Sequence, residues 1–122
     1  MRKIMFILLL CISLFCCNCS SYKDYGEVAN ELYQKDPNTD FIIVQNTVYI
    51  NASQILWVKE LVLTKNIKIG EIQRSLVTNK YKNFDATVAS VGASIYTSKE
   101  YNEILLLESK GEYLPYLGLI EG

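Results

Sequence analysis

The sequence predicts an α+β domain, mostly antiparallel β, folded as a small sheet or a partly open barrel with one or two short helices. Three observations predict this class. Short runs of β-branched and aromatic residues recur from residue 41 onward, separated by turns containing Asn, Ser and Gly. One amphipathic segment precedes these runs, and a length of 122 residues suits a single domain. We therefore expect roughly five to seven short strands.

The amino terminus has the pattern of a secretory signal peptide. Arg2 and Lys3 precede a twelve-residue apolar run, Ile4 to Phe15, which only Ser13 interrupts. The run is shorter than the ~20 residues that a transmembrane helix needs. It is also apolar all round, whereas a helix of a folded domain has one polar face. We predict that residues 1–16 form a signal peptide that precedes the domain and directs export.

Three cysteines follow the apolar run, at Cys16, Cys17 and Cys19. The stretch resembles a bacterial lipobox, with Leu14 three residues before Cys17 and the small Cys16 directly before it. The resemblance implies lipidation at Cys17, with Cys19 or Cys16 as alternatives, and a protein anchored to a bacterial membrane by covalent acyl chains. A zinc site is not expected because no cysteine or histidine follows Cys19. A disulfide between cysteines this close would be strained.

The rest of the chain divides into a lipidated amino terminus and tether, residues 17–26, and one small β-rich domain, residues 27–122. In the first part of the domain Val28, Ala29, Leu32 and Tyr33 recur at helical spacing. This spacing predicts a short helix from Glu27 to Gln34, before a proline that cannot continue it.

Strand patterns begin directly after this helix. The runs Phe41 to Val44 and Val48 to Ile50 predict a hairpin around the sequence QNT, although it lacks the Asn-Gly pair typical of tight hairpins. The segment ASQILWVKELVLT fits both helical and strand spacing, and we predict a short helical turn that leads into a strand. The segment IKIGEIQ predicts a strand with a bulge at Gly70.

The last third of the chain has the clearest hairpin. A strand is expected after Gly92, in VGASIYTS. The run Ile104 to Leu107 then precedes a turn at SKGE and a returning strand from Tyr113 to Ile120. Because Pro115 has no N–H to donate, we expect the returning strand to be an edge strand or a bulged one.

Several short motifs occur in a fixed order along the domain, including VYINAS, KIGEI, VGASIY, ILLLE and the terminal YLPYLGLIEG. In this order they resemble a group of small bacterial lipoproteins in which a signal peptide precedes a compact β-rich domain. The resemblance covers about residues 41–122. It implies an envelope location and no catalytic residue, because the group has no assigned activity.

Composition excludes several classes of function. The chain contains no histidine, which is the usual general base and the commonest metal ligand. The formal charge of −1 gives no excess of cations for nucleic acid. Glycine-rich phosphate loops and acidic calcium loops are missing from the sequence as well. We therefore expect no cofactor, no metal and no nucleic-acid partner, and the sequence favours a protein without catalytic activity.

Two alternatives for function remain. A noncatalytic module anchored to the membrane through its lipid would bind a protein, a peptide or a glycan, and the aromatic residues Trp57, Tyr113 and Tyr116 are the candidates for its partner surface. The alternative is a small hydrolase or lyase that uses paired carboxylates. The carboxylates available for it in the second half of the chain are Asp85, Glu100, Glu103, Glu108 and Glu112.

Overall fold

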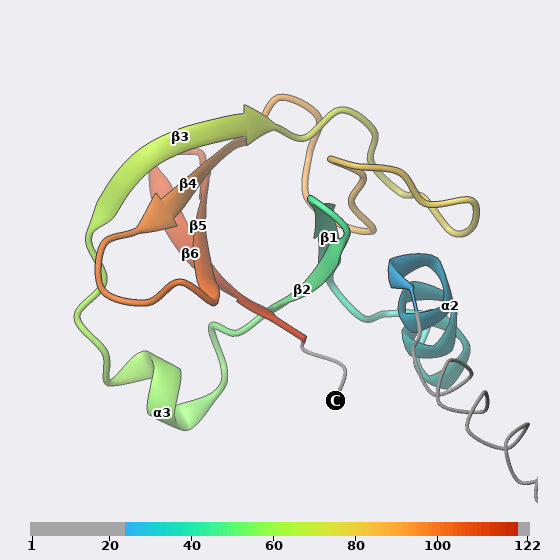
Figure 1. Cartoon of the computed structure of the whole chain (residues 1–122), viewed down its shortest axis with the longest axis horizontal. Coiled ribbons are helices and arrows are strands. Elements are labelled where there is room, and N and C mark those ends of the chain that lie inside the picture. Colours follow the sequence, from blue (N-terminus) through green and yellow to red (C-terminus); the bar gives the residue numbers. More distant parts are fainter. Residues whose placement is uncertain (1–23, 120–122) are drawn as a thin grey trace, which may run out of the picture.

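The computed structural model describes residues 24–119, so the predicted signal peptide and the candidate cysteines lie outside the described residues. The fold is mostly antiparallel β, as predicted. One six-stranded sheet with the order β1-β2-β6-β5-β4-β3 curls into a partly open barrel (Figure 1). Its strands are β1 (Phe41–Val44), β2 (Thr47–Asn51), β3 (Lys65–Glu71), β4 (Ser94–Ser98), β5 (Ile104–Ser109) and β6 (Glu112–Gly118).

Two short helices lie outside the curl, α2 (Tyr25–Lys35) and α3 (Leu56–Lys59). The predicted helix at 27–34 is confirmed as α2. It starts where the Asp24 carboxylate accepts the Glu27 N–H at 3.0 Å, and it buries Val28 and Ala29 against the outer side of β1 and β2. Within residues 24–119 no helix is long and apolar enough to cross a membrane.

The hairpin of β1 and β2 is confirmed, with a turn of two residues. Gln45 and Asn46 both have positive φ, 51° and 68°. This is the geometry of a type I′ turn, whose twist matches that of the two strands. The Asn83 side chain supports the turn by accepting the Gln45 N–H at 2.8 Å. The turn has no Asn-Gly pair, and a hydrogen bond from the loop that contains Asn83 stabilises it instead.

The ambiguous segment after β2 forms the predicted helical turn, α3, but the strand starts only at Lys65. Leu61 and Leu63 instead pack against a cluster of Ala52, Val58 and Ile104 on the outside of the sheet. The packing of these two leucines holds residues 60–64 against the sheet. These residues form no strand, and β3 begins directly after them.

The predicted irregularity in β3 is confirmed. The register between β3 and β4 shifts between Lys68 and Gly70. A Cβ atom on Gly70 would lie 2.5 Å from the ring of Phe84, so only glycine lets the ring pack this close. The strand expected after Gly92 is confirmed as β4.

The last hairpin is confirmed as β5 and β6, joined by Lys110 and Gly111, both with positive φ. The expectation that Pro115 makes this an edge or bulged strand is wrong, since β6 lies between β2 and β5 with a continuous β5 register. The Pro115 carbonyl accepts the Ala52 N–H at 2.8 Å, beyond the last β2–β6 pair at Asn51. Its ring nitrogen faces that same side, where no ladder bond is required.

A short segment that is not a regular strand bridges the two edges of the curled sheet. We call residues 84–87 the closing segment. On one side it exchanges hydrogen bonds with β1, where Ile43 N–H donates to the Asp85 carbonyl at 2.9 Å. On the other side Gln73 N–H donates to the Phe84 carbonyl at 2.8 Å, just after β3. The barrel is thereby bridged at its open side.

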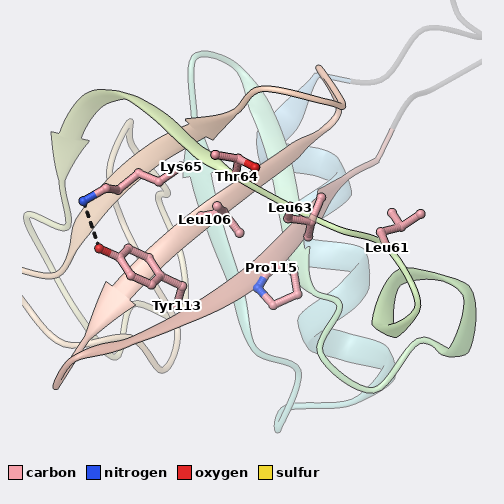
Figure 2. Close-up of a pocket in the computed structure, with 7 residues that line it drawn as sticks. All are labelled: Leu61, Leu63, Thr64, Lys65, Leu106, Tyr113 and Pro115. Carbon is pink, nitrogen blue, oxygen red and sulfur yellow. Dashed lines mark hydrogen bonds between the residues drawn. The ribbon is translucent and has the colours of Figure 1, made fainter.

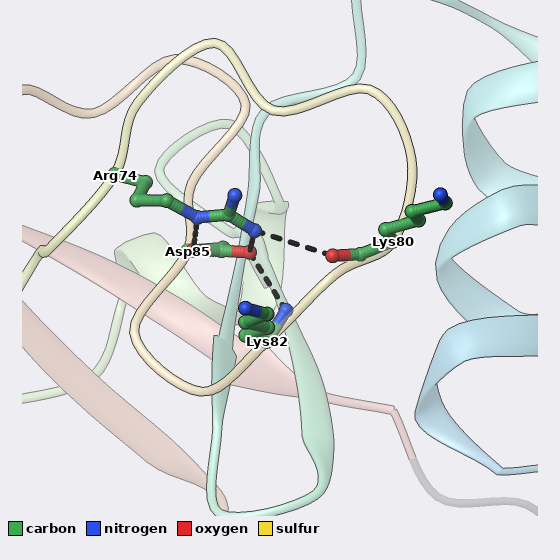
Figure 3. A network of polar contacts seen from close by, with 4 residues as sticks. All are labelled: Arg74, Lys80, Lys82 and Asp85. Carbon is green, nitrogen blue, oxygen red and sulfur yellow. Dashed lines mark hydrogen bonds and ion pairs between the residues drawn. The ribbon is translucent and has the colours of Figure 1, made fainter.

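An ion pair between an exposed arginine and a buried aspartate fixes the closing segment (Figure 3). Asp85, 1% exposed, accepts two hydrogen bonds from the Arg74 guanidinium, at 2.8 and 2.6 Å, and one from the Lys82 N–H at 2.7 Å. Arg74 also donates to the Lys80 carbonyl at 3.2 Å. The hydrogen bond to Asp85 raises the pKa of Arg74. Together these bonds hold the loop from residue 74 to residue 85 against the barrel.

Candidate functional site

A groove on the outer face of the sheet combines apolar side chains with a positive charge (Figure 2). We call it the outer groove. Its volume is about 430 Å³, toward the lower end of the ~300–1,000 Å³ typical of small-molecule sites. It is lined by Leu61, Leu63, Thr64, Lys65, Leu106, Tyr113 and Pro115.

Strand register places the floor of the groove. Tyr96, Leu106 and Pro115 are direct partners across β4, β5 and β6, so their side chains share one face of the sheet. Leu105 and Leu107 point to the opposite face, into the core of the barrel. Leu106 is only 4% exposed although it faces outward. The segment after α3, with its two leucines, forms the wall of the groove.

Lys65 lies at one end of the groove, between two tyrosines. Its ammonium donates to the Tyr113 hydroxyl at 3.0 Å and lies 4.8 Å from the centroid of the Tyr96 ring and 5.3 Å from that of the Tyr113 ring. The hydrogen bond to Tyr113 is the main cause that raises the pKa of Lys65, so the ammonium is charged at neutral pH. Among the residues that the structure describes, no carboxylate forms an ion pair with Lys65.

The three aromatic residues predicted for a partner surface have different positions. Tyr113, 41% exposed, lines the outer groove. Trp57, 50% exposed, lies on α3 and does not line it. The prediction for Tyr116 is wrong, because this residue is 1% exposed. It lies three positions after Tyr113 on the same strand, and this odd spacing turns the two side chains to opposite faces.

Tyr116 belongs to a polar network beside the core. Its hydroxyl donates to Asp40 Oδ1 at 2.9 Å, and Asn51 Nδ2 donates to the other Asp40 oxygen at 2.9 Å. Burial, and then the charge of Asp40, raise the pKa of Tyr116 above the ordinary value for tyrosine. The network links the start of β1 to the ends of β2 and β6.

We expect this network to make the fold less stable as the pH rises into the alkaline range. Above about pH 10 the unfolded chain loses the Tyr116 proton while the folded chain keeps it, so stability that is complete below pH 10 falls as pH rises. In the Tyr116→Phe variant, the free energy of unfolding should fall less steeply with pH, by about 1.4 kcal/mol per pH unit. Urea unfolding of both proteins between about pH 9 and pH 11 measures it. Parallel slopes for the two proteins would contradict the role of Tyr116.

The carboxylates considered for hydrolysis each have different neighbours in the structure. Asp85 is buried with Arg74, and Glu100 accepts two hydrogen bonds from Thr64, which lower its pKa. Glu108 accepts a bond from Tyr96 at 3.3 Å, while Glu103 lines a second pocket beside Tyr49. Glu112 pairs with Ser109 next to the β5–β6 turn. No group of three potential metal ligands occurs within residues 24–119.

Sequence reasoning found Tyr113 but missed Lys65 and Leu106. Lys65 and Tyr113 are 48 positions apart and meet only because β3, β4, β5 and β6 are neighbours in the sheet. A contact between residues so far apart in the chain leaves no local pattern in the sequence. For Leu106, the third position of the run ILLL, strand alternation would have placed the side chain on the face opposite to Leu105 and Leu107. No family model, curated protein or solved structure matches this chain.

Proposed function

We propose that this protein is an exported, lipid-anchored envelope protein that binds a ligand in the outer groove and catalyses no reaction. The outer groove is the observation that carries the binding role. It joins a buried leucine floor to a cation that has no ion-pair partner in the described part of the chain. A small number of polar groups at one end of an apolar cleft is the usual composition of a ligand site.

The lipid anchor is supported by the sequence. A basic and then apolar amino terminus ends at Leu14, Cys16 and Cys17 in the order of a lipobox. The seven positions from Cys17 to Asp24 span at most about 25 Å, given ~3.5 Å for each extended residue. An anchor at Cys17 would therefore keep the start of α2 within about this distance of a membrane surface.

The hydrolase alternative receives no support from the position of the carboxylates. The outer groove contains none, and the pockets on α2 and beside Tyr49 contain one each, Glu31 and Glu103. Hydrolysis of a glycosidic bond by the usual route requires two carboxyl groups on opposite sides of that bond. We therefore do not propose an enzyme.

The anchor is tested by replacing single cysteines in the full chain. The Cys17→Ala variant should lose all incorporation of labelled palmitate and move out of the membrane fraction, because the thiol that carries the lipid is gone. Cys11→Ala is the matched control, since this residue lies within the apolar run, and it should keep both properties. Loss of label only in Cys19→Ala or Cys16→Ala would assign the anchor to that residue. Label that persists in all three variants would contradict a lipid anchor here.

A further inference from the structure

The outer groove has two chemically different ends. Lys65 and Tyr113 lie at one end and Leu61 at the other, with Leu63, Leu106 and Pro115 between them (Figure 2). The Lys65 ammonium is held by a hydroxyl and two aromatic rings, all of which are uncharged. The nearby carboxylates bind elsewhere, Glu108 to Tyr96 and Glu100 to Thr64. An occupant with an anionic head and an apolar body would match both ends.

The backbone of the groove floor does not suit an extended peptide. Peptides that add to a sheet are held by free main-chain N–H and C=O groups. Here Leu106 lies in a central strand and is paired with Tyr96 on β4 and with Pro115 on β6. Pro115 has no N–H, and its carbonyl accepts the Ala52 N–H. A ligand without amide groups can cover this floor and leave none of its own hydrogen-bonding groups without a partner.

A glycan is also a poor match for the lining. Sugars bind by stacking on free aromatic faces and by several hydrogen bonds. The Lys65 ammonium lies over both the Tyr96 and the Tyr113 ring. The Thr64 hydroxyl already donates to Glu100 at 2.7 Å. Lys65 and the Tyr113 hydroxyl are thus the main polar groups left for a ligand, and both lie at the same end.

We propose that the outer groove binds the anion of a single-chain fatty acid, with the carboxylate on Lys65 and Tyr113 and the alkyl chain along the leucines. The assignment deepens the proposed binding function and rests on it. The ammonium donates to the carboxylate, and the Tyr113 hydroxyl, which accepts from Lys65, can donate its own proton to the same group. The chain lies over the buried Leu106, and it removes the exposed apolar surface of Leu61, Leu63 and Pro115 from water.

Photocrosslinking of the full chain in isolated membranes tests this site. The probe is dodecanoate with a diazirine in its alkyl chain, and adducts are located by peptide mass spectrometry after illumination. We expect adducts on residues 61–65 and 113–115, and competition by free dodecanoate but not by dodecanol. The Lys65→Met variant should weaken competition by dodecanoate about tenfold, which corresponds to the loss of one charge-assisted hydrogen bond.

Lys68→Met is the matched control because Lys68 lies on the same strand, pairs with Glu71 and does not line the groove. It should leave the adducts and the competition unchanged. Both lysines are exposed, so neither variant should alter the circular dichroism spectrum. Adducts spread over other surfaces, equal competition by dodecanol, or equal effects of the two variants would overturn the proposal. Palmitate incorporation measured on the same membranes reports the anchor separately, so that failure of one is distinguishable from failure of the other.

Discussion

Replacing Asp85 with Ala is expected to lower the free energy of unfolding by about 3 kcal/mol. The substitution removes three hydrogen bonds to a buried carboxylate, two from Arg74 and one from the Lys82 N–H. It also leaves a cavity beneath the closing segment. The loss stays below the upper range for buried ion pairs because the Arg74 side chain is 47% exposed and regains water. Urea unfolding followed by circular dichroism measures the change.

The control for this prediction is the exposed pair of Lys68 and Glu71, whose side chains are 45% and 46% exposed. Glu71→Ala should leave the urea midpoint unchanged within error, since exposed pairs contribute little. An equal effect of Asp85→Ala and Glu71→Ala would show that the pair of Arg74 and Asp85 does not hold the closing segment in place.

Replacing Gly70 with Ala is expected to cost about 2 kcal/mol, because the added methyl group would lie 2.5 Å from Phe84 Cζ and 2.7 Å from Cε1. The ring cannot move freely. Phe84 packs on the core of the barrel and its backbone bonds to both Ile43 and Gln73. The methyl group must therefore displace either β3 or the closing segment. Thermal and urea unfolding of the variant measure the cost.

The same substitution at Gly26 is the control, because a Cβ atom there meets Asp24 Oδ1 at 3.4 Å, an ordinary contact. Gly26 lies in α2, where Ala is favoured over Gly, and stability should rise by about 0.5–1 kcal/mol. A Gly70→Ala, Phe84→Leu double variant should be less unstable than the sum of the two single variants. Additive effects would mean that the ring is not the obstacle.

Local pattern was sufficient to predict most elements. Each hairpin joins runs of β-branched or aromatic residues close in sequence, and the α2 stripe is set by residues three and four positions apart. The order of strands was not accessible in this way. Pro115 shows the reason, because its tolerance in a central strand depends on where β2 ends, and β2 lies more than sixty positions earlier. The closing segment also escaped prediction, since its irregular backbone pairs over long distances.

The candidate site was predicted only in part, for a similar reason. Tyr113 was predicted to be a surface residue because it lies on the strand that contains Pro115, which was expected at an edge. Tyr116 was misplaced because strand alternation was not applied to two residues at odd spacing. Lys65 carries the charge of the groove, yet in sequence it is an ordinary lysine before an isoleucine strand. Its role arises from the tyrosines of β4 and β6, which the sheet brings to it.

The closing segment has a consequence for how the protein avoids aggregation. β1 has the sequence FIIV, and all four of its residues are buried. A short apolar strand of this kind is a template for pairing between chains when its edge is free. The closing segment occupies that edge through hydrogen bonds to Phe41 and Ile43. Each transient opening of the Arg74–Asp85 ion pair would therefore expose the edge of β1 to pairing with another chain. We expect the ion pair to limit aggregation in this way.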